Sequence, residues 1–187
     1  MLIVTKRGYE KMDKIKLGVL VGGTSIEREV SKKSCENLLA NLDENKYEIT
    51  VYHLPADGNT EWAKNIISNP PQIVLSALHG GNGENGSIQG FLHCLNIPYI
   101  GSKVLSSAIC MNKAMAKTVM KANHIQVPDH VFVMRGVDFS QYKESIKLMG
   151  FPLIVKPNRG GSSIGVIVAR NMEDIHYGIK NIIETYD

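Results

Sequence analysis

The most chemically specific stretch of the sequence is FPLIVKPNRGGSSIGV, from Phe151 to Val166. Lys156 lies within its apolar half, where an ammonium group is costly to bury without an anionic partner. The loop that follows is built from glycine and serine, whose N–H groups and hydroxyls can surround phosphate oxygens. The stretch is not a P-loop, because the lysine precedes the glycines and no Gly-Lys-Ser/Thr occurs. It therefore indicates phosphate binding, and a plain β-hairpin is the alternative.

A second lysine, Lys113, follows Asn112, a residue type that commonly caps the start of a helix. Lys113 would then lie in the first helical turn, where a cation opposes the helix dipole. One interpretation is a solvated lysine. In the other, Lys113 and the N–H groups of the helix start face a phosphate together.

Glu27 is a candidate for contact with a substrate. It follows Gly22 and Gly23 in the segment GGTSIEREVS. The two glycines allow a tight turn and let a ligand approach the backbone, and the start of the next helix offers N–H groups. Thr24 to Glu27 also fits a capping box, so Glu27 is either part of a helix cap or a ligand-binding carboxylate.

His79 opens a second glycine-rich segment, HGGNGENG, which ends at Gly86. The segment follows an apolar run, and glycines at the carboxyl end of a strand let the backbone come close to a ligand. His79 could donate a hydrogen bond to a carboxylate or a developing oxyanion, and Glu84 could hold the ring or a helix end in place. The alternative is a flexible loop with a satisfied histidine.

Together these four motifs resemble those of the D-alanine:D-alanine ligases, which have the ATP-grasp fold. GGTSxEREVS, HGxxGExG, MxK and VKPxRxGSSxG occur in the family's order, and the resemblance extends from residue 15 to about residue 175. It implies an N-terminal α/β domain that binds the first amino acid, and two further lobes that clamp ATP. It also implies a two-step reaction for peptidoglycan synthesis. ATP phosphorylates the carboxylate of one D-alanine, and the amine of a second D-alanine then attacks the acyl phosphate.

The resemblance assigns roles at the amino-acid site. Glu27 would bind the ammonium of the first D-alanine, with Ser25 also at the substrate. His79 would orient the substrate carboxylate, and Glu84 would support the site from behind. Ser162 would join Glu27 in a hydrogen-bonded arrangement, so that Glu27, His79 and Ser162 are the implied catalytic residues.

The resemblance also assigns ATP contacts. Lys113 and Lys156 would contact the phosphates, with Lys156 also near the adenine. Ser163 and Gly161 would cover the γ-phosphate, beside Ser162. Catalysis would then consist of positioning and charge neutralisation, as is usual in phosphoryl transfer.

Three departures from the family pattern are visible. Asn85 and Asn112 stand where the family often has aspartate, and Gly160 stands where some members have glutamate. The sequence ends at Asp187, before the positions of the family's adenine-contacting strand, lid, catalytic arginine and Mg²⁺-binding acidic residues. We therefore expect no ligands for Mg²⁺ or Mn²⁺ in these 187 residues, and no turnover by this chain alone. A non-catalytic interaction module and a ligase for D-lactate or D-serine are the alternatives.

The elements that must position these residues alternate between strand and helix. Strands are expected at 15–21, 47–54, 72–78 and 98–100, and helices at 26–41, 62–67 and 86–95. This alternation predicts a doubly wound α/β domain with a parallel sheet. Its core candidates on the first helix are Val30, Leu38, Leu39 and Leu42.

The pattern changes near residue 112 to a smaller α+β unit, an ATP-grasp subdomain if the resemblance holds. Helices are expected at 113–123, 141–149 and 172–185, and strands at 130–134, 153–157 and 165–169, with the last two forming a hairpin. The predicted organisation is an extension at 1–12, a substrate domain at 13–112 and part of an ATP clamp at 113–187. The family's C-terminal lobe is not represented.

Composition and charge limit the kinds of partner that the protein is expected to bind. The net charge is +3, and no apolar run approaches the ~18–20 residues of a membrane span, so neither nucleic acid nor a membrane is expected as partner. The start does not resemble a signal peptide, which favours a cytoplasmic protein. Cys35, Cys94 and Cys110 are expected to be buried, reduced thiols. Family members commonly dimerise through the N-terminal domain, and the apolar helix at 86–95 is a candidate for that interface.

Overall fold

A computed structural model describes residues 13–185, so the extension expected at 1–12 lies outside the described residues. The described chain folds into two compact units. The first contains residues 13–79 and 91–101, and the second contains residues 80–90 and 102–185. The division thus falls near residue 102, and the glycine-rich loop after His79 belongs to the second unit. Whether residues 13–112 and 113–187 unfold as separate cooperative units stays a prediction.

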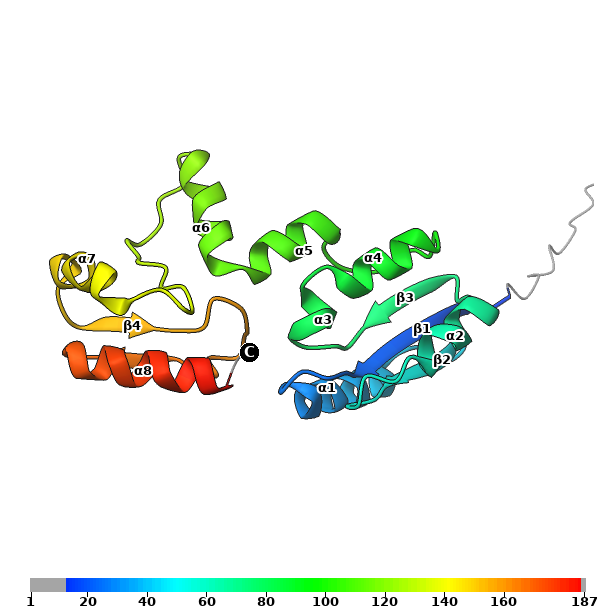
Figure 1. The fold of residues 1–187 in the computed structure, drawn as a ribbon. Helices are drawn as coiled ribbons and strands as arrows, with labels where there is room; N and C mark the ends of the chain where they lie inside the picture. Colours follow the sequence, from blue (N-terminus) through cyan, green and yellow to red (C-terminus); the bar gives the residue numbers. More distant parts are fainter. Residues whose placement is uncertain (1–12, 186–187) are drawn as a thin grey trace, which may run out of the picture. The chain divides into compact units, whose positions relative to one another are not determined.

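The first unit is built on a parallel three-stranded sheet with the strand order β2-β1-β3 (Figure 1). Its strands are β1 (Ile15–Gly22), β2 (Tyr47–Leu54) and β3 (Ile73–Ser76). The last six residues of β1 are buried, as expected for a central parallel strand covered on both faces. Residues 98–100 form only an isolated bridge, between Tyr99 and Val74, in place of the strand expected there.

The helices of this unit are α1 (Arg28–Asn41) and α2 (Glu61–Ser68). Helix α1 faces the sheet through Ser31, Cys35, Leu38, Leu39 and Leu42, which recur at helical spacing. The placement of Val30 in the core was wrong, because its side chain is 45% exposed and the adjacent Ser31 is buried instead.

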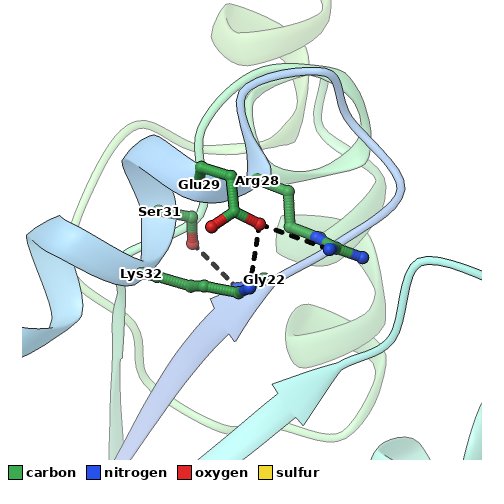
Figure 2. A network of polar contacts seen from close by, with 5 residues as sticks. All are labelled: Gly22, Arg28, Glu29, Ser31 and Lys32. Carbon is green, nitrogen blue, oxygen red and sulfur yellow. Dashed lines mark hydrogen bonds and ion pairs between the residues drawn. The ribbon is translucent and has the colours of Figure 1, made fainter.

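The turn after β1 depends on Gly22. Its φ is +96°, and a Cβ added there would lie 2.5 Å from the carbonyl oxygen of Leu54. The N–H of Gly22 donates to Ser31 Oγ at 2.8 Å (Figure 2). The N–H of Gly23 donates to Leu54 O at 2.7 Å. These contacts fix where the chain leaves the strand and enters α1.

The second unit combines several short helices with a hairpin. Its helices are α3 (Gly81–Glu84), the start of α4 (Ser87–Cys94), α5 (Val104–Met111), α6 (Lys113–Ala122), the 3₁₀ helix η1 (Phe139–Tyr142), α7 (Lys143–Met149) and α8 (Met172–Thr185). Strands β4 (Leu153–Val155) and β5 (Ile167–Ala169) pair antiparallel, which confirms the predicted hairpin. The hydrophobic core beside this hairpin consists of Ile146, Ala169 and Ile175.

Three other expectations need correction. The strand expected at 130–134 has no regular structure, because no described strand pairs with it. Helix α5 was not expected at all. Of the three free cysteines only Cys35 is buried, whereas Cys94 and Cys110 are exposed. No helix among residues 13–185 is long and apolar enough to cross a membrane.

The geometry at Gly22 makes a prediction about stability. Gly22→Ala should lower the free energy of unfolding by about 2–4 kcal/mol, because it adds left-handed strain to a clash with Leu54 O. Gly90→Ala is the matched control: nothing lies within 4 Å of its added Cβ, and the change to a better helix former should stabilise by up to about 1 kcal/mol. Urea unfolding measures both. Equal effects of the two substitutions would show that the turn is not constrained in this way.

Candidate functional site

The sheet order places two of the predicted site residues at the same end of the first unit's sheet. Because β1 lies between β2 and β3, the connections from β1 and from β3 leave the sheet in opposite directions. A crevice at the carboxyl ends of such neighbouring strands is where ligands bind in open α/β sheets. The segment from Gly23 to Glu27 follows β1, and His79 follows β3, so the first unit places both at this end of the sheet.

Glu27 is nearly completely buried, with 5% of its surface exposed. It occupies the N-cap position of α1, but its side chain makes no capping hydrogen bond, so the capping-box interpretation is wrong. Ser25 Oγ accepts from the N–H of Glu27 at 3.1 Å and holds the turn before the helix. A buried carboxylate at this end of the sheet is a candidate for contact with a substrate ammonium.

The next acidic residue, Glu29, behaves differently. Its carboxylate is exposed and accepts from Lys32 Nζ at 2.8 Å and from Arg28 Nη2 at 3.2 Å (Figure 2). The hydrogen bonds from Lys32 and Arg28 lower the pKa of Glu29. Glu29 is thus a solvated, paired surface charge, whereas Glu27 is buried.

His79 is positioned by α1. Its Nε2 lies 2.8 Å from Ser34 Oγ, and which atom donates depends on the histidine tautomer. Ser34 thus orients the imidazole. Sequence reasoning missed Ser34, whose only signal is its place about one helical turn after Ser31.

In the second unit, the start of α6 is tied to the Gly/Ser loop. Asn112 is the N-cap, as predicted, and its Oδ1 accepts from Met115 N. The N–H groups of Lys113 and Ala114 donate to the carbonyl oxygen and Oδ1 of Asn158, and the N–H of Ala116 donates to Asn112 O. All four N–H groups of the first turn therefore have acceptors. The idea that this helix start itself faces a phosphate is wrong.

Lysine side chains converge here instead. Lys113 Nζ donates to Gly160 O at 2.8 Å. Burial lowers the pKa of Lys113, and the charge of Lys156 lowers it further. The pKa of Lys117 is lowered by burial and then by Lys156, with Asp129 partly opposing these effects. Sequence reasoning missed Lys117, although its spacing of four residues from Lys113 places both on one helix face.

The Gly/Ser loop has an unusual backbone. Ser162 and Ser163 have φ values of +50° and +59°, and Gly160 and Gly165 also lie in the left-handed region. Two successive non-glycine residues there are rare, and such strain gathers at ligand-binding loops. The N–H of Ile164 donates to Gly161 O at 3.1 Å, so the loop folds back on itself. The segment is thus a β-hairpin, as one interpretation expected, and its loop has the unusual backbone described above.

Glu84 lies at the end of α3, beside a cavity of about 440 Å³ in the second unit. The cavity is lined by Gly83, Glu84, Gln89, Ser107, Lys113 and Gly160, among others. Among residues 13–185, no group of three or more His, Cys, Asp or Glu side chains could hold a metal ion.

The predicted site residues fall into two sets. Ser25, Glu27 and His79 belong to the first unit. Glu84, Lys113, Lys156, Gly161, Ser162 and Ser163 belong to the second. The arrangement of Ser162 with Glu27 joins the two sets and stays a prediction.

The lysine cluster makes a prediction about titration. Lys156→Met should raise the pKa of both Lys113 and Lys117, because it removes a positive charge that lowers them. Lys180→Met, on α8, is the control and should leave both values unchanged. NMR titration of the lysine side chains measures them. If the Lys113 and Lys117 curves stay the same in Lys156→Met, the three ammonium groups are not close neighbours.

Comparison with known proteins gives a consistent result. Residues 60–102 match the family model described as D-ala D-ala ligase N-terminus, and residues 119–187 match the model described as D-ala D-ala ligase C-terminus. The chain is 40% identical over 171 residues to a D-alanine–D-alanine ligase from Bacillus anthracis, covering 91% of this chain and 54% of that protein. It is 38% identical over 170 residues to D-alanine–D-alanine ligase B from Clostridium perfringens, covering 86% and 51%.

Solved structures agree. The chain is similar to the B. anthracis ligase complexed with ATP, with a TM-score of 0.77, 37% identity and coverage of 91% of this chain and 55% of that one. A D-Ala:D-Ser ligase from Enterococcus faecalis gives a TM-score of 0.76 at 27% identity, with coverage of 92% and 60%. The chain spans about half the length of the curated relatives it matches. The motifs, the fold and these matches together show that the chain belongs to the D-alanine–D-alanine ligase family.

Proposed function

We propose that this chain supplies the site for the first amino acid and the triphosphate-binding part of an ADP-forming D-alanine:D-alanine ligase. In this reaction a carboxylate oxygen of the first D-alanine attacks the γ-phosphorus of ATP, and ADP leaves. The amine of the second D-alanine then attacks the acyl phosphate, and inorganic phosphate leaves as the peptide bond forms. The observation that carries the proposal is the burial of Glu27 in the turn that follows β1, at the same end of the sheet as His79, which follows β3.

At the amino-acid site, the roles follow from charge. Glu27 binds the substrate ammonium, because a buried carboxylate gains most from a cationic partner. His79, oriented by Ser34, donates to the substrate carboxylate, and Ser25 holds the turn that carries Glu27. Ser162 joins this group from the Gly/Ser loop, and Glu84 supports the site without touching the reacting atoms.

At the nucleotide site, Lys113 and Lys156 bind the phosphates, and Lys156 also lies by the adenine. Lys117 adds a third positive charge nearby. The N–H groups and hydroxyls of Gly161, Ser162 and Ser163 cover the γ-phosphate. An anion that enters this cluster neutralises repulsion between the lysines, so the groups that bind ATP also stabilise the charge that develops during phosphoryl transfer.

The second substrate distinguishes two candidates. Similarity to a D-Ala:D-Ser ligase at 27% identity keeps D-serine as an alternative to the second D-alanine. Supplying a protein that contains this chain with D-alanine, D-serine or D-lactate, and identifying the ligated product by mass spectrometry, separates these candidates. A protein that binds neither D-alanine nor ATP would instead be a non-catalytic module.

We also propose that the protein is cytoplasmic and forms a homodimer through its first unit. The exposed Cys94 and half-buried Leu95, at the end of α4, remain candidates for the interface. Leu92 does not, because it is buried in its own chain, and Phe91 already packs against Trp62.

Glu27 provides the sharpest test of the amino-acid site. Glu27→Gln should weaken D-alanine binding by about 10- to 150-fold, because a desolvated charged hydrogen bond contributes roughly 1.5–3 kcal/mol. Glu29→Gln is the matched control: it also removes one negative charge from the same turn, but from an exposed pair, and it should leave D-alanine binding unchanged. Isothermal titration calorimetry measures the affinity, and thermal unfolding measures stability. A Glu27→Gln protein that is less stable but binds D-alanine normally would make Glu27 a purely structural residue.

A further inference from the structure

Two asparagines that are 46 residues apart share the start of α6. Asn158 Oδ1 accepts from the N–H of Ala114 at 2.9 Å, and Asn158 Nδ2 donates to Asn112 Oδ1 at 3.0 Å. Asn112 Oδ1 also accepts from the N–H of Met115 at 3.0 Å. A backbone N–H can only donate, so these two backbone groups fix which atom of each amide is the oxygen. The pair therefore has one orientation, in which Asn158 is the donor.

The contact extends beyond a helix cap. The carbonyl oxygen of Asn158 accepts from the N–H of Lys113 at 3.0 Å, and two residues later Gly160 O accepts from Lys113 Nζ at 2.8 Å. Residues 112–116 and 158–160 are thus joined by several hydrogen bonds at the point where the Gly/Ser loop begins. Residue 160 is a glycine with a φ of +119°. Because glycine can adopt many backbone conformations, contacts with other residues must hold the backbone at this point.

We propose that Asn158 is a positioning residue, which holds the Gly/Ser loop against the first turn of α6 and so fixes the Lys113 ammonium at the Gly160 carbonyl. The importance of this position for triphosphate binding rests on the proposed function. In this role Asn158 contacts α6 and not the phosphate. It occupies first-turn N–H groups of α6, and it leaves the anion to the lysine side chains and to residues 161–163.

The fixed orientation makes the two asparagines unequal. Asn112→Asp keeps an oxygen that accepts from Met115 and from Asn158, and it places a negative charge at a helix N-terminus, where it is favourable. Asn158→Asp keeps an acceptor for Ala114 but turns an acceptor toward Asn112 Oδ1, and so replaces a hydrogen bond by repulsion. Both substitutions add one negative charge at the same end of α6, so each controls for the charge of the other.

Hydrogen exchange in the free 187-residue chain tests the contact without a ligand. In Asn158→Asp, the amide of Met115 should exchange roughly fivefold faster or more, because its acceptor is pushed away. In Asn158→Ala, the amide of Ala114 should show an increase of about the same size. In Asn112→Asp, both amides should exchange as in the wild type. Unchanged exchange in both Asn158 variants, or an equal change in Asn112→Asp, would overturn the proposal.

Binding of inorganic tripolyphosphate tests the consequence, at a temperature where thermal unfolding shows each variant to be folded. Asn158→Asp should bind tripolyphosphate about tenfold more weakly than Asn112→Asp, because Lys113 and the loop are no longer held together. Equal binding by these two variants would overturn the positioning role. A wild-type chain that binds no tripolyphosphate would contradict the proposed nucleotide site, and the exchange result would still decide the contact made by Asn158.

Discussion

The nucleotide site proposed in the second unit depends on three neighbouring lysines, Lys113, Lys117 and Lys156. The charge of Lys156 lowers the pKa of both Lys113 and Lys117, and burial adds to the effect at each. A lysine with a lowered pKa binds fewer protons when folded than when unfolded, between its lowered pKa and its ordinary value. In that pH range the free energy of unfolding of the free chain rises with pH. At lower pH the lysines are all charged, and their repulsion and burial destabilise the fold in full. An anion bound there would offset this cost at neutral pH, which supports the proposed phosphate site.

Several elements of the second unit hold these lysines in place. The hairpin of β4 and β5 carries Lys156 just beyond its first strand, and α6 carries the other two lysines on one face. Asn112 and Asn158 occupy the first-turn N–H groups of α6, which would otherwise be competing anion donors. The first unit treats two nearby carboxylates differently. It buries the carboxylate of Glu27 at a sheet edge and leaves Glu29 in a solvated pair.

Features that depend on local pattern could be predicted from the sequence. The buried run before Gly22-Gly23, the hairpin around the Gly/Ser loop and the Asn112 cap each follow from neighbouring residues. Features set by distant contacts were missed. Val30 is apolar, but packing on the sheet turned Ser31 and Cys35 inward instead. Apolar residues at 130–134 were expected to form a strand, yet a strand needs a hydrogen-bonded neighbour. The role of Asn158 arises from a helix that starts 45 residues earlier, and nothing in its own segment indicates it.

We propose that the second unit binds a triphosphate through Lys113, Lys117 and Lys156. The most direct measurement is hydrogen exchange of the whole chain with and without inorganic tripolyphosphate, with sodium sulfate at matched ionic strength as the control. Ligand bound only to the folded state stabilises it by RT ln(1 + [L]/Kd). Tripolyphosphate should therefore slow exchange at α6, β4 and residues 158–166 more than sulfate does, and leave residues 15–54 unchanged. Equal slowing by both salts, or slowing spread evenly over the two units, would contradict the claim.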